Sequence, residues 1–512
     1  MTVRVERSRL GVVIVAVVAG SVLLCSPSGG VVPVGQPPVT AVDGTPAPPA
    51  PPTPTPSPPT PSTPSSNTIP VSGVVSVNEP VTTLAPSTIV APIQAGSGPT
   101  STTVVSSSTV LPTSVPASGT PASTTPTPKQ LVGPRNAEEL RAAVLSALAL
   151  STSKSRSVFV VLDDTDTVVD LEADAARTPA STQKVYVAGA VLAKLGGDHR
   201  YVTEVRSSTI VAGGAADELV LRASGDPSFS SSQLGALADA VVKAGVQRAP
   251  KGLVLDDAHF DNKTRLDIWK RSFTPGEVGV LSSFTIDGNH RSDAETSADP
   301  GMANLKRFRA ALVARGVTVG LGMRRGELLD GGPVVASVQS APLRDLVRTM
   351  LKKSDNTYAE MFTKELGARN GNGSTSGGVA AISAYMVQLG VAAPVAQVDG
   401  SGLSSSNRST ARQQVDFLRR TSTASYAADF LDGLPVACVD GTMRNRLCQT
   451  SGARSVRAKT GGIDFVVGLA GFGQTSTGTR VTFSFLLNEV RSSSSARASI
   501  DKALAAISSS TL

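Results

Sequence analysis

Histidine is scarce in this chain, and its scarcity limits the chemistry available to it. The 512 residues include only three histidines: His199, His259 and His290. No G-x-S-x-G elbow accompanies them, so the sequence does not support a Ser-His-Asp triad. The one local group of metal-ligand types lies at Asp256, Asp257, His259 and Asp261. We interpret this group as solvated carboxylates in a loop at a strand end, and we predict no metal site and no cofactor.

Charge is almost absent from one long stretch. Between residues 26 and 128 the only charged residues are Asp43 and Glu79, and Pro, Thr, Ser, Val and Gly dominate. Such a composition cannot bury enough apolar surface to build a core. Proline repeats favour polyproline II, so we predict that residues 26–130 form a disordered but semi-rigid stalk. A solvated linker without a spacing role is the alternative.

A basic run interleaved with aromatic residues is also missing. The formal net charge of +7 is spread along the chain, and aromatic residues make up 4% of it. Nucleic-acid binding surfaces concentrate Lys and Arg, and many stack bases on aromatic side chains. We therefore expect no nucleic-acid partner.

The apolar run at the N-terminus is short. Three arginines precede the stretch from Leu10 to Cys25, whose sixteen residues fall below the roughly 20 that a spanning helix needs. We predict that residues 1–25 are an export signal, either a cleaved signal peptide or an uncleaved membrane anchor. The rest of the chain is then extracytoplasmic, in the cell envelope. Leu24 stands where a lipobox needs a small residue, which argues against lipidation.

Cysteine is rare as well. Outside the N-terminal segment the chain has two cysteines, Cys438 and Cys448, with nine residues between them. This number excludes a disulfide-dense scaffold. In an oxidising setting the spacing favours a local disulfide, and two unpaired thiols in a loop are the alternative.

The first candidate for chemistry is the S-T-Q-K segment from Ser181 to Lys184. Predicted strands at 158–162 and 168–171 precede it, and apolar residues at helical spacing follow it. We expect Ser181 to open a helix on which Lys184 lies beside it, because residues three apart are neighbours. A lysine amine can then take the serine proton once burial lowers the lysine pKa. Alone the motif is weak, and a surface Ser and Lys would explain it.

The second candidate is Ser354-Asp355-Asn356, between two segments with helical apolar spacing. Capping of the following helix by Ser354 or Asp355 would explain these residues without any chemistry. In the functional alternative, Ser354 relays a proton between a leaving amine and the lysine. The Asn356 amide would hold both Lys184 and a substrate backbone.

The third candidate is Lys459-Thr460-Gly461-Gly462, followed by predicted strands at 466–472 and 481–487. On an exposed strand edge, Lys459 and Thr460 would bind a carboxylate. Gly461 and Gly462 would let a substrate strand approach the backbone closely. A plain turn is the alternative for this motif.

Together and in this order, the three motifs match the signature shared by class A β-lactamases and penicillin-binding proteins. The long separation between Ser181 and Ser354 differs from that of class A β-lactamases. The chain resembles the low-molecular-weight class C penicillin-binding proteins, the D-alanyl-D-alanine carboxypeptidase/endopeptidase family, from about residue 137 to 510. Further stretches similar to this family begin at Ser224, Gly252, Asp399 and Leu434.

The resemblance implies a fold and a division of the chain. The expected fold is the α/β (α+β) penicillin-binding/β-lactamase-like transpeptidase fold, in which helices flank an antiparallel sheet. An accessory domain is expected between the first and second motifs. The expected parts are catalytic pieces at 131–202 and 339–512, and the inserted domain at 203–338.

The resemblance also implies a reaction and its partners. Ser181 would be acylated by the penultimate D-Ala of a peptidoglycan stem peptide, and β-lactam antibiotics would acylate it as mimics. The implied roles are Lys184 as base, Ser354 and Asn356 as relay, the N–H groups of Ser181 and Gly462 as oxyanion hole, and Lys459 and Thr460 as carboxylate site. Two other functions stay open: a β-lactamase that hydrolyses its acyl-enzyme quickly, and a non-catalytic wall-binding scaffold.

Overall fold

The computed structural model describes residues 133–151, 153–207, 213–290, 298–327 and 332–512. They all belong to one compact unit of the chain, Ser118–Leu512. The predicted signal at 1–25 and the predicted stalk at 26–130 lie outside the described residues. Among the helices of the described ranges, none has the length and hydropathy that crossing a bilayer requires.

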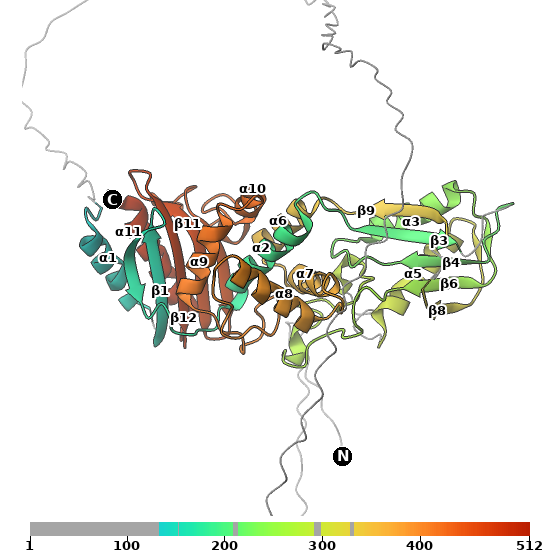
Figure 1. Cartoon of the computed structure of the whole chain (residues 1–512), viewed down its shortest axis with the longest axis horizontal. Helices are drawn as coiled ribbons and strands as arrows, with labels where there is room; N and C mark the ends of the chain where they lie inside the picture. The colour runs from blue at the N-terminus through green and yellow to red at the C-terminus, as the bar shows by residue number, and fades with distance from the viewer. Residues whose placement is uncertain (1–132, 152, 208–212, 291–297, 328–331) are drawn as a thin grey trace, which may run out of the picture. The chain divides into compact units, whose positions relative to one another are not determined.

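The first sheet is antiparallel and draws its strands from two distant parts of the chain. Its five strands run in the order β10-β11-β12-β1-β2 (Figure 1). They are β1 (Ser155–Leu162), β2 (Asp166–Leu171), β10 (Arg457–Ile463), β11 (Val466–Gln474) and β12 (Arg480–Asn488). β1 pairs with β12, so the sheet forms only when the N-terminal and C-terminal pieces meet.

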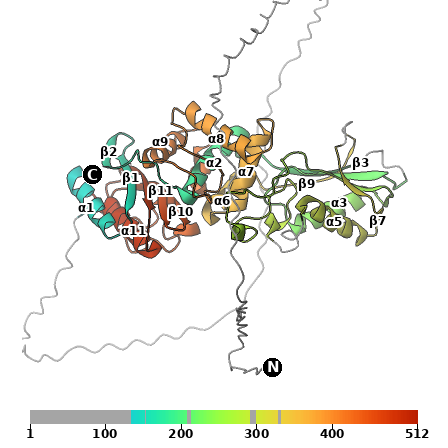
Figure 2. The same cartoon turned by 90° about the horizontal axis from the view of Figure 1, so that it is seen from below.

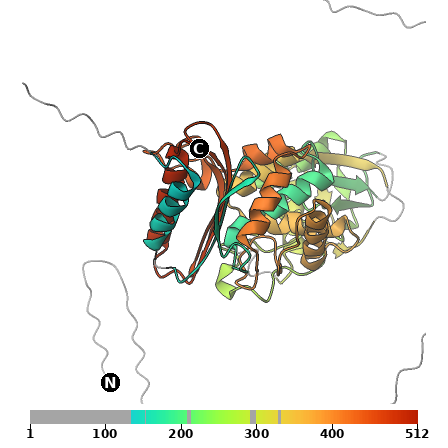
Figure 3. The same ribbon diagram turned by 60° about the vertical axis from the view of Figure 1, so that its left-hand side comes forward.

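Helices cover both faces of this sheet, which explains why β11 and β12 are apolar almost throughout. α1 (Ala137–Ala149) and α11 (Ser493–Ser509) pack on one face and enclose a core that includes Phe483. α9 (Ala411–Thr421) packs on the other face, against β1 and β12. Figure 3 shows the sheet between α1 and α11 on one side and the remaining helices on the other.

The helical layer surrounds α2. Its helices are η1 (Ala180–Gln183), α2 (Lys184–Leu195), α6 (Leu343–Lys353), α7 (Asn356–Ala368), α8 (Thr375–Gln388) and α10 (Ala427–Gly433). Most of α2 is buried, and its apolar residues join a second core with Phe362 and Phe417. The first residue of α2, Lys184, is one of these buried residues.

A second sheet uses only residues between α2 and α6, in the order β8-β6-β4-β3-β9 (Figure 1). Its strands are β3 (Val202–Ser207), β4 (Glu218–Arg222), β6 (Gly252–Asp256), β8 (Met323–Arg325) and β9 (Val334–Gln339). α3 (Ser231–Lys243) and α5 (Pro300–Val313) pack with it around a separate core, and β5 (Arg248–Ala249) pairs with β7 (Thr318–Val319). Figure 2 shows its strands β3 and β9 alongside α3 and α5. The sheet covers 202–339, close to the inserted domain predicted at 203–338. The division into domains itself stays a prediction.

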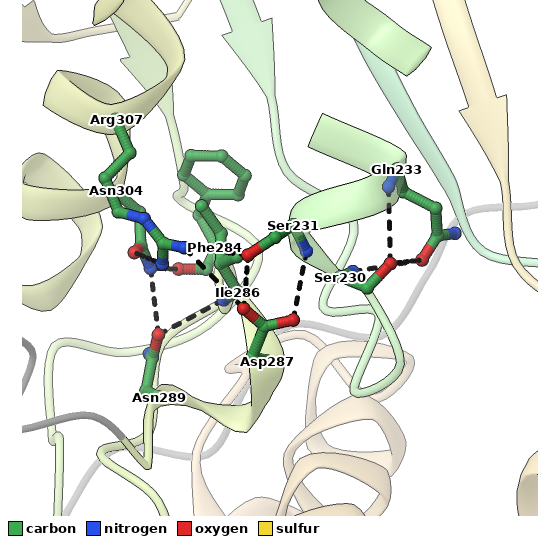
Figure 4. Close-up of polar contacts among 9 residues, drawn as sticks. All are labelled: Ser230, Ser231, Gln233, Phe284, Ile286, Asp287, Asn289, Asn304 and Arg307. Carbon is green, nitrogen blue, oxygen red and sulfur yellow. Dashed lines mark hydrogen bonds and ion pairs between the residues drawn. The ribbon is translucent and has the colours of Figure 1, made fainter. Parts of the chain in front are cut away.

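A polar network orders the loop of the inserted segment that approaches α7 (Figure 4). Asp287 accepts the first backbone N–H of α3 (3.0 Å) and pairs with Arg307 of α5 (3.6 Å). Asn289 accepts a hydrogen bond from Asn304 Nδ2 (2.9 Å) and donates one to the carbonyl of Val280 (2.9 Å). The inserted core is thereby connected to the segment that contacts the start of α7.

Cys438 and Cys448 form a disulfide bond, with their Cα atoms 4.8 Å apart. The bond closes a loop beside β10, where Ala437 N–H donates to the carbonyl of Val456 (2.9 Å). The loop contains Thr442, which contacts the third motif.

Candidate active site

Ser181 lies in a tight turn that leads into α2. η1 covers Ala180–Gln183 and α2 begins at Lys184, so a 3₁₀ turn precedes the α-helix that Ser181 was expected to open. Ala180 has a φ of 48°, a left-handed conformation that costs free energy and that is enriched at functional sites. Lys184 Nζ donates a hydrogen bond to Ser181 Oγ at 2.8 Å. The predicted pair is therefore in direct contact.

Oxygen acceptors surround the side-chain nitrogen of Lys184. Besides Ser181, Nζ contacts Asn356 Oδ1 (2.7 Å) and the carbonyl of Ser401 (2.5 Å). The Lys184 side chain has no exposed surface. Three acceptors thus hold the amine in one position beside the serine hydroxyl.

Burial also makes Lys184 a weaker base than an ordinary lysine. It lowers the Lys184 pKa to about 8, although the carboxylates of Asp399, Glu360 and Asp355 favour the charged form. At mildly alkaline pH, Lys184 is then a free amine in a substantial fraction of the molecules. The free amine is the form that can accept a proton from Ser181.

The second motif combines a helix cap with two groups that face the site. Asp355 caps α7 by accepting a hydrogen bond from Tyr358 N–H (3.0 Å), as the capping interpretation predicts. Ser354 ends α6 in a left-handed conformation with a φ of 61°. Asn356 opens α7 and donates its Nδ2 to the carbonyl of Glu277 (2.8 Å). That bond leaves Asn356 Oδ1 for Lys184.

The third motif lies on β10, at the edge of the first sheet. Lys459 Nζ donates to Ser354 Oγ (2.8 Å) and to the carbonyl of Thr460 (2.8 Å). Lys459 is on the edge strand, but its side chain is fully buried, so the exposure that the sequence predicted for it is wrong. Burial, together with the charge of Lys184, holds the Lys459 pKa well below its ordinary value. Each buried lysine therefore contacts one serine hydroxyl.

The two glycines of the third motif have different surroundings. A Cβ on Gly461 would lie 2.8 Å from the carbonyl oxygen of Pro179 and 3.0 Å from Thr182 Cγ2. Gly461 therefore lets β10 pack against the turn that carries Ser181, rather than against a substrate strand. Gly462 is exposed and lines the cavity in front of Ser181.

This cavity is open to solvent and has a volume of about 460 Å³. Its lining includes all three motifs and the inserted segment: Ser181, Ser354, Asn356 and Gly462, with Phe273 and Glu277. A peptide end that enters it would reach the Ser181 hydroxyl with Ser354 and Gly462 beside it.

The residues of the metal-ligand type are engaged in ion pairs or hydrogen bonds with basic or acidic neighbours. The ion pairs are Asp256 with Arg222, Asp257 with Arg325 and Asp261 with Lys364, and the His259 ring is hydrogen-bonded to Glu365. Across the described ranges, no three His, Cys, Asp or Glu residues converge as metal ligands would. The three aspartates are thus held in salt bridges and are not merely solvated, as the sequence interpretation had them.

The sequence did not predict the parts of Ser401 and Glu360 in the site. Ser401 takes part through its backbone carbonyl. Every residue has this group, so the residue type gives no signal of the contact. Glu360 lies one helical turn after Asn356 and binds the backbone at Gly400 and Ser401. The spacing of Asn356 and Glu360 on one helix face was the signal that could have drawn attention to it.

The antiparallel sheet, the serine-lysine pair and the second lysine on the edge strand define a serine hydrolase of the penicillin-binding class. The profile of the D-Ala-D-Ala carboxypeptidase 3 (S13) family matches residues 137–292 and 276–510. The chain belongs to this family. The resemblance predicted from the three motifs is confirmed, and so is the predicted fold class.

Individual relatives agree with this assignment. Carboxypeptidase DacB of Mycolicibacterium smegmatis is 30% identical over 377 residues, which cover 68% of this chain and 79% of that protein. A D-alanyl-D-alanine carboxypeptidase of an Actinomadura species is 29% identical over 378 residues, covering 57% of this chain and 70% of that protein. The crystal structure of penicillin-binding protein 4 from Haemophilus influenzae has the same fold, with a TM-score of 0.64 at 20% identity over 70% of this chain and 98% of that one.

Proposed function

We propose that this chain is a serine-type D-alanyl-D-alanine carboxypeptidase that trims peptidoglycan stem peptides and also opens cross-links as an endopeptidase. The observation that carries the proposal is the 2.8 Å contact between Lys184 Nζ and Ser181 Oγ, next to a cavity of about 460 Å³. Family membership supports the substrate class, because the relatives are named carboxypeptidases.

Acylation begins when Lys184 Nζ takes the proton of Ser181 and Oγ attacks the carbonyl carbon of the penultimate D-Ala. The backbone N–H groups of Ser181 and Gly462 stabilise the oxyanion that forms. The bond from this carbon to the nitrogen of the terminal D-Ala then breaks. The products of this half-reaction are an ester on Ser181 and a leaving amine that needs one proton.

Ser354 is suited to deliver that proton. Its Oγ accepts a hydrogen bond from Lys459 Nζ at 2.8 Å, so its own hydrogen can point toward the leaving nitrogen. The proton that Ser181 gave to Lys184 can pass to the amine through this hydroxyl. Asn356 keeps Lys184 in place, and Thr460 on the edge strand would hold the terminal carboxylate of the substrate.

Hydrolysis completes the cycle. Water attacks the ester carbon, the bond to Ser181 Oγ breaks, and the shortened stem peptide leaves as a carboxylate. When the leaving amine belongs to a second stem peptide, the same steps open a cross-link. A β-lactam would acylate Ser181 in the same way, but its leaving group stays tethered after ring opening and obstructs water.

We also propose a location for the reaction. A substrate in peptidoglycan requires the catalytic part to work outside the cytoplasm, in the cell envelope. The N-terminal export signal and the stalk predicted at 26–130 would bring it there. Whether the signal is removed or anchors the chain in the membrane can be read from the N-terminus of the mature protein.

Release of D-alanine tests the proposed function. A peptide that ends in D-Ala-D-Ala should lose one D-Ala in the presence of the wild-type protein and none with Ser181→Ala. A matched peptide that ends in D-Ala-L-Ala is the control and should stay intact. Absence of release from the D-Ala-D-Ala peptide would contradict the carboxypeptidase assignment.

A further inference from the structure

Glu360 is a buried carboxylate that the proposed steps do not use. It lies one turn after Asn356 on α7, so both side chains leave the same face of the helix. Its side chain has no exposed surface. Oε1 accepts hydrogen bonds from the backbone N–H groups of Gly400 (3.0 Å) and Ser401 (2.7 Å), whereas Oε2 has no hydrogen-bond partner in the described part of the chain.

These bonds connect Glu360 to the reacting groups through a single residue. The carbonyl of Ser401 accepts a hydrogen bond from Lys184 Nζ (2.5 Å) and one from Ser181 Oγ (3.5 Å). Ser401 is thus bound by Glu360 at its N–H and by Lys184 and Ser181 at its carbonyl. A displacement of Glu360 would move the carbonyl that fixes the amine of Lys184.

Anchoring of the loop alone does not explain a carboxylate at this position. Asp399, a second buried carboxylate, already binds the loop N–H groups of Gly402 (2.9 Å) and Ser404 (2.8 Å), and Trp269 Nε1 (3.0 Å). A glutamine at position 360 could accept the same two N–H groups without burying a charge. Because burying an ionisable carboxyl group is costly and a glutamine would avoid that cost, the carboxyl group of Glu360 calls for a role of its own.

The charged groups around Lys184 show what that role is. Three carboxylates, Asp399, Glu360 and Asp355, favour its ammonium form, and Lys459 faces it as a second amine. Burial, with Asp399 beside it, raises the Glu360 pKa to about 8, while bonds from Ser401 and the charge of Lys184 act in the opposite direction. Burial therefore brings the two deprotonations toward each other, because it raises the pKa of Glu360 and lowers that of Lys184.

We propose that Glu360 is a positioning residue for acylation, which holds the Ser401 carbonyl against Lys184 and whose charge controls how readily Lys184 releases its proton. This inference rests on the proposed Ser181 acyl-enzyme. As the pH rises, Glu360 becomes an anion and thereby opposes deprotonation of Lys184. A plot of the wild-type acylation rate against pH should therefore be less steep than the curve expected for the titration of a single group.

The test is the rate of acylation by benzylpenicillin as a function of pH, followed by intact mass on the full chain. Glu360→Gln keeps an oxygen for the two backbone N–H groups and removes the charge. Without the anion the ammonium form of Lys184 is less stable, so the midpoint of the profile should move to lower pH by about one unit. The rise should also become as steep as a single titration.

A second variant and a control separate charge from position. Glu360→Asp keeps the charge but withdraws the carboxylate by one methylene, so the maximal rate should fall by roughly 10- to 100-fold. Glu365→Gln is the matched control, since Glu365 is a fully buried carboxylate on the same helix, paired with His259 and Arg369. Its profile should keep the wild-type midpoint.

Two results would overturn the inference: a Glu360→Gln midpoint equal to that of the wild type, or a wild-type profile as steep as a single titration. The second result needs no variant, so it decides the question even if Glu360→Gln does not fold. Failure of the wild-type protein to form any adduct would instead overturn the proposed function.

Discussion

Lys184 and Lys459 are both fully buried, and each of them contacts a different serine hydroxyl. In the proposed mechanism Lys184 takes the proton of Ser181, to which it is bonded, and Lys459 is bonded to Ser354, the hydroxyl that passes a proton to the leaving amine. Burial lowers the pKa of both lysines. At the scale of residues, the site therefore places one buried amine beside each of the two serine hydroxyls.

Asn356→Asp tests the electrostatic account of Lys184. The new carboxylate would stand where Asn356 Oδ1 now lies 2.7 Å from Lys184 Nζ, and an anion there favours the ammonium form. The Lys184 pKa should rise, so acylation by benzylpenicillin should be slow at neutral pH and recover partly at higher pH. The measurement is the acylation profile against pH, and a midpoint equal to that of the wild type would contradict the account.

The three motifs could be recognised in the sequence, because each consists of particular residue types at a short spacing. Ser181 and Lys184 are three residues apart, and Asn356 directly follows a helix cap. The contacts that Ser401 and Glu277 make with the site could not be predicted, since both residues bind through backbone carbonyls. Burial of Lys459 was also missed, because residue type alone does not show that this side chain is enclosed beside Ser354, the C-cap of α6.

The inserted segment supports the site at the scale of elements. The Glu277 carbonyl orients the Asn356 amide (2.8 Å), and Gly279 N–H donates to Thr357 Oγ1 on α7 (2.8 Å). Trp269 Nε1 donates to Asp399 Oδ2 (3.0 Å) in the loop that carries Ser401. The segment thus holds α7 and this loop at the same time.

Trp269→Phe tests the support of the loop. Phenylalanine keeps most of the apolar contact but leaves Asp399 without one donor, which should lower the free energy of unfolding by about 1–3 kcal/mol. Acylation should slow, because the loop holds the Ser401 carbonyl. Urea unfolding and benzylpenicillin acylation measure the two effects.

Phe308→Leu is the control for this variant, since Phe308 lies in the core that packs against the second sheet. It should lower stability without changing the acylation rate. An unchanged acylation rate in Trp269→Phe would show that the inserted segment does not position the loop.

The disulfide is a second element that can be tested. Cys438 and Cys448 are 10 positions apart and enclose Thr442, whose hydroxyl accepts a hydrogen bond from Thr460 Oγ1 (2.8 Å). Replacing both cysteines by serine removes a constraint on the unfolded chain and should lower the free energy of unfolding by roughly 2–3 kcal/mol. The midpoint of urea unfolding measures this, and an unchanged midpoint would contradict a stabilising bond.

At the scale of the whole described unit, the two sheets have separate cores, and the helices α2, α6 and α7 lie between them (Figure 1). The chain leaves the first sheet after β2, passes Ser181, builds the second sheet and returns through Ser354 and Asn356. The site therefore forms only when both pieces of the first sheet and the inserted segment are in place.

Much of this arrangement was predictable. Alternating turns and apolar runs indicated the strands of the first sheet, and the long separation of Ser181 from Ser354 indicated an insertion. The topology of the second sheet was not predictable, because the parallel pairing of β4 with β6 and of β6 with β8 depends on contacts between segments far apart in sequence. The contacts of Glu277 and Trp269 with the site depend on the same long-range packing.

The proposed function depends on a covalent bond to Ser181. The most direct measurement is the intact mass of the wild-type protein and of Ser181→Ala over time after mixing with benzylpenicillin. We predict a long-lived increase equal to the mass of one benzylpenicillin in the wild type and none in Ser181→Ala. No adduct in the wild type, or an equal adduct in both proteins, would contradict the account, and an adduct that is lost within seconds would identify a β-lactamase.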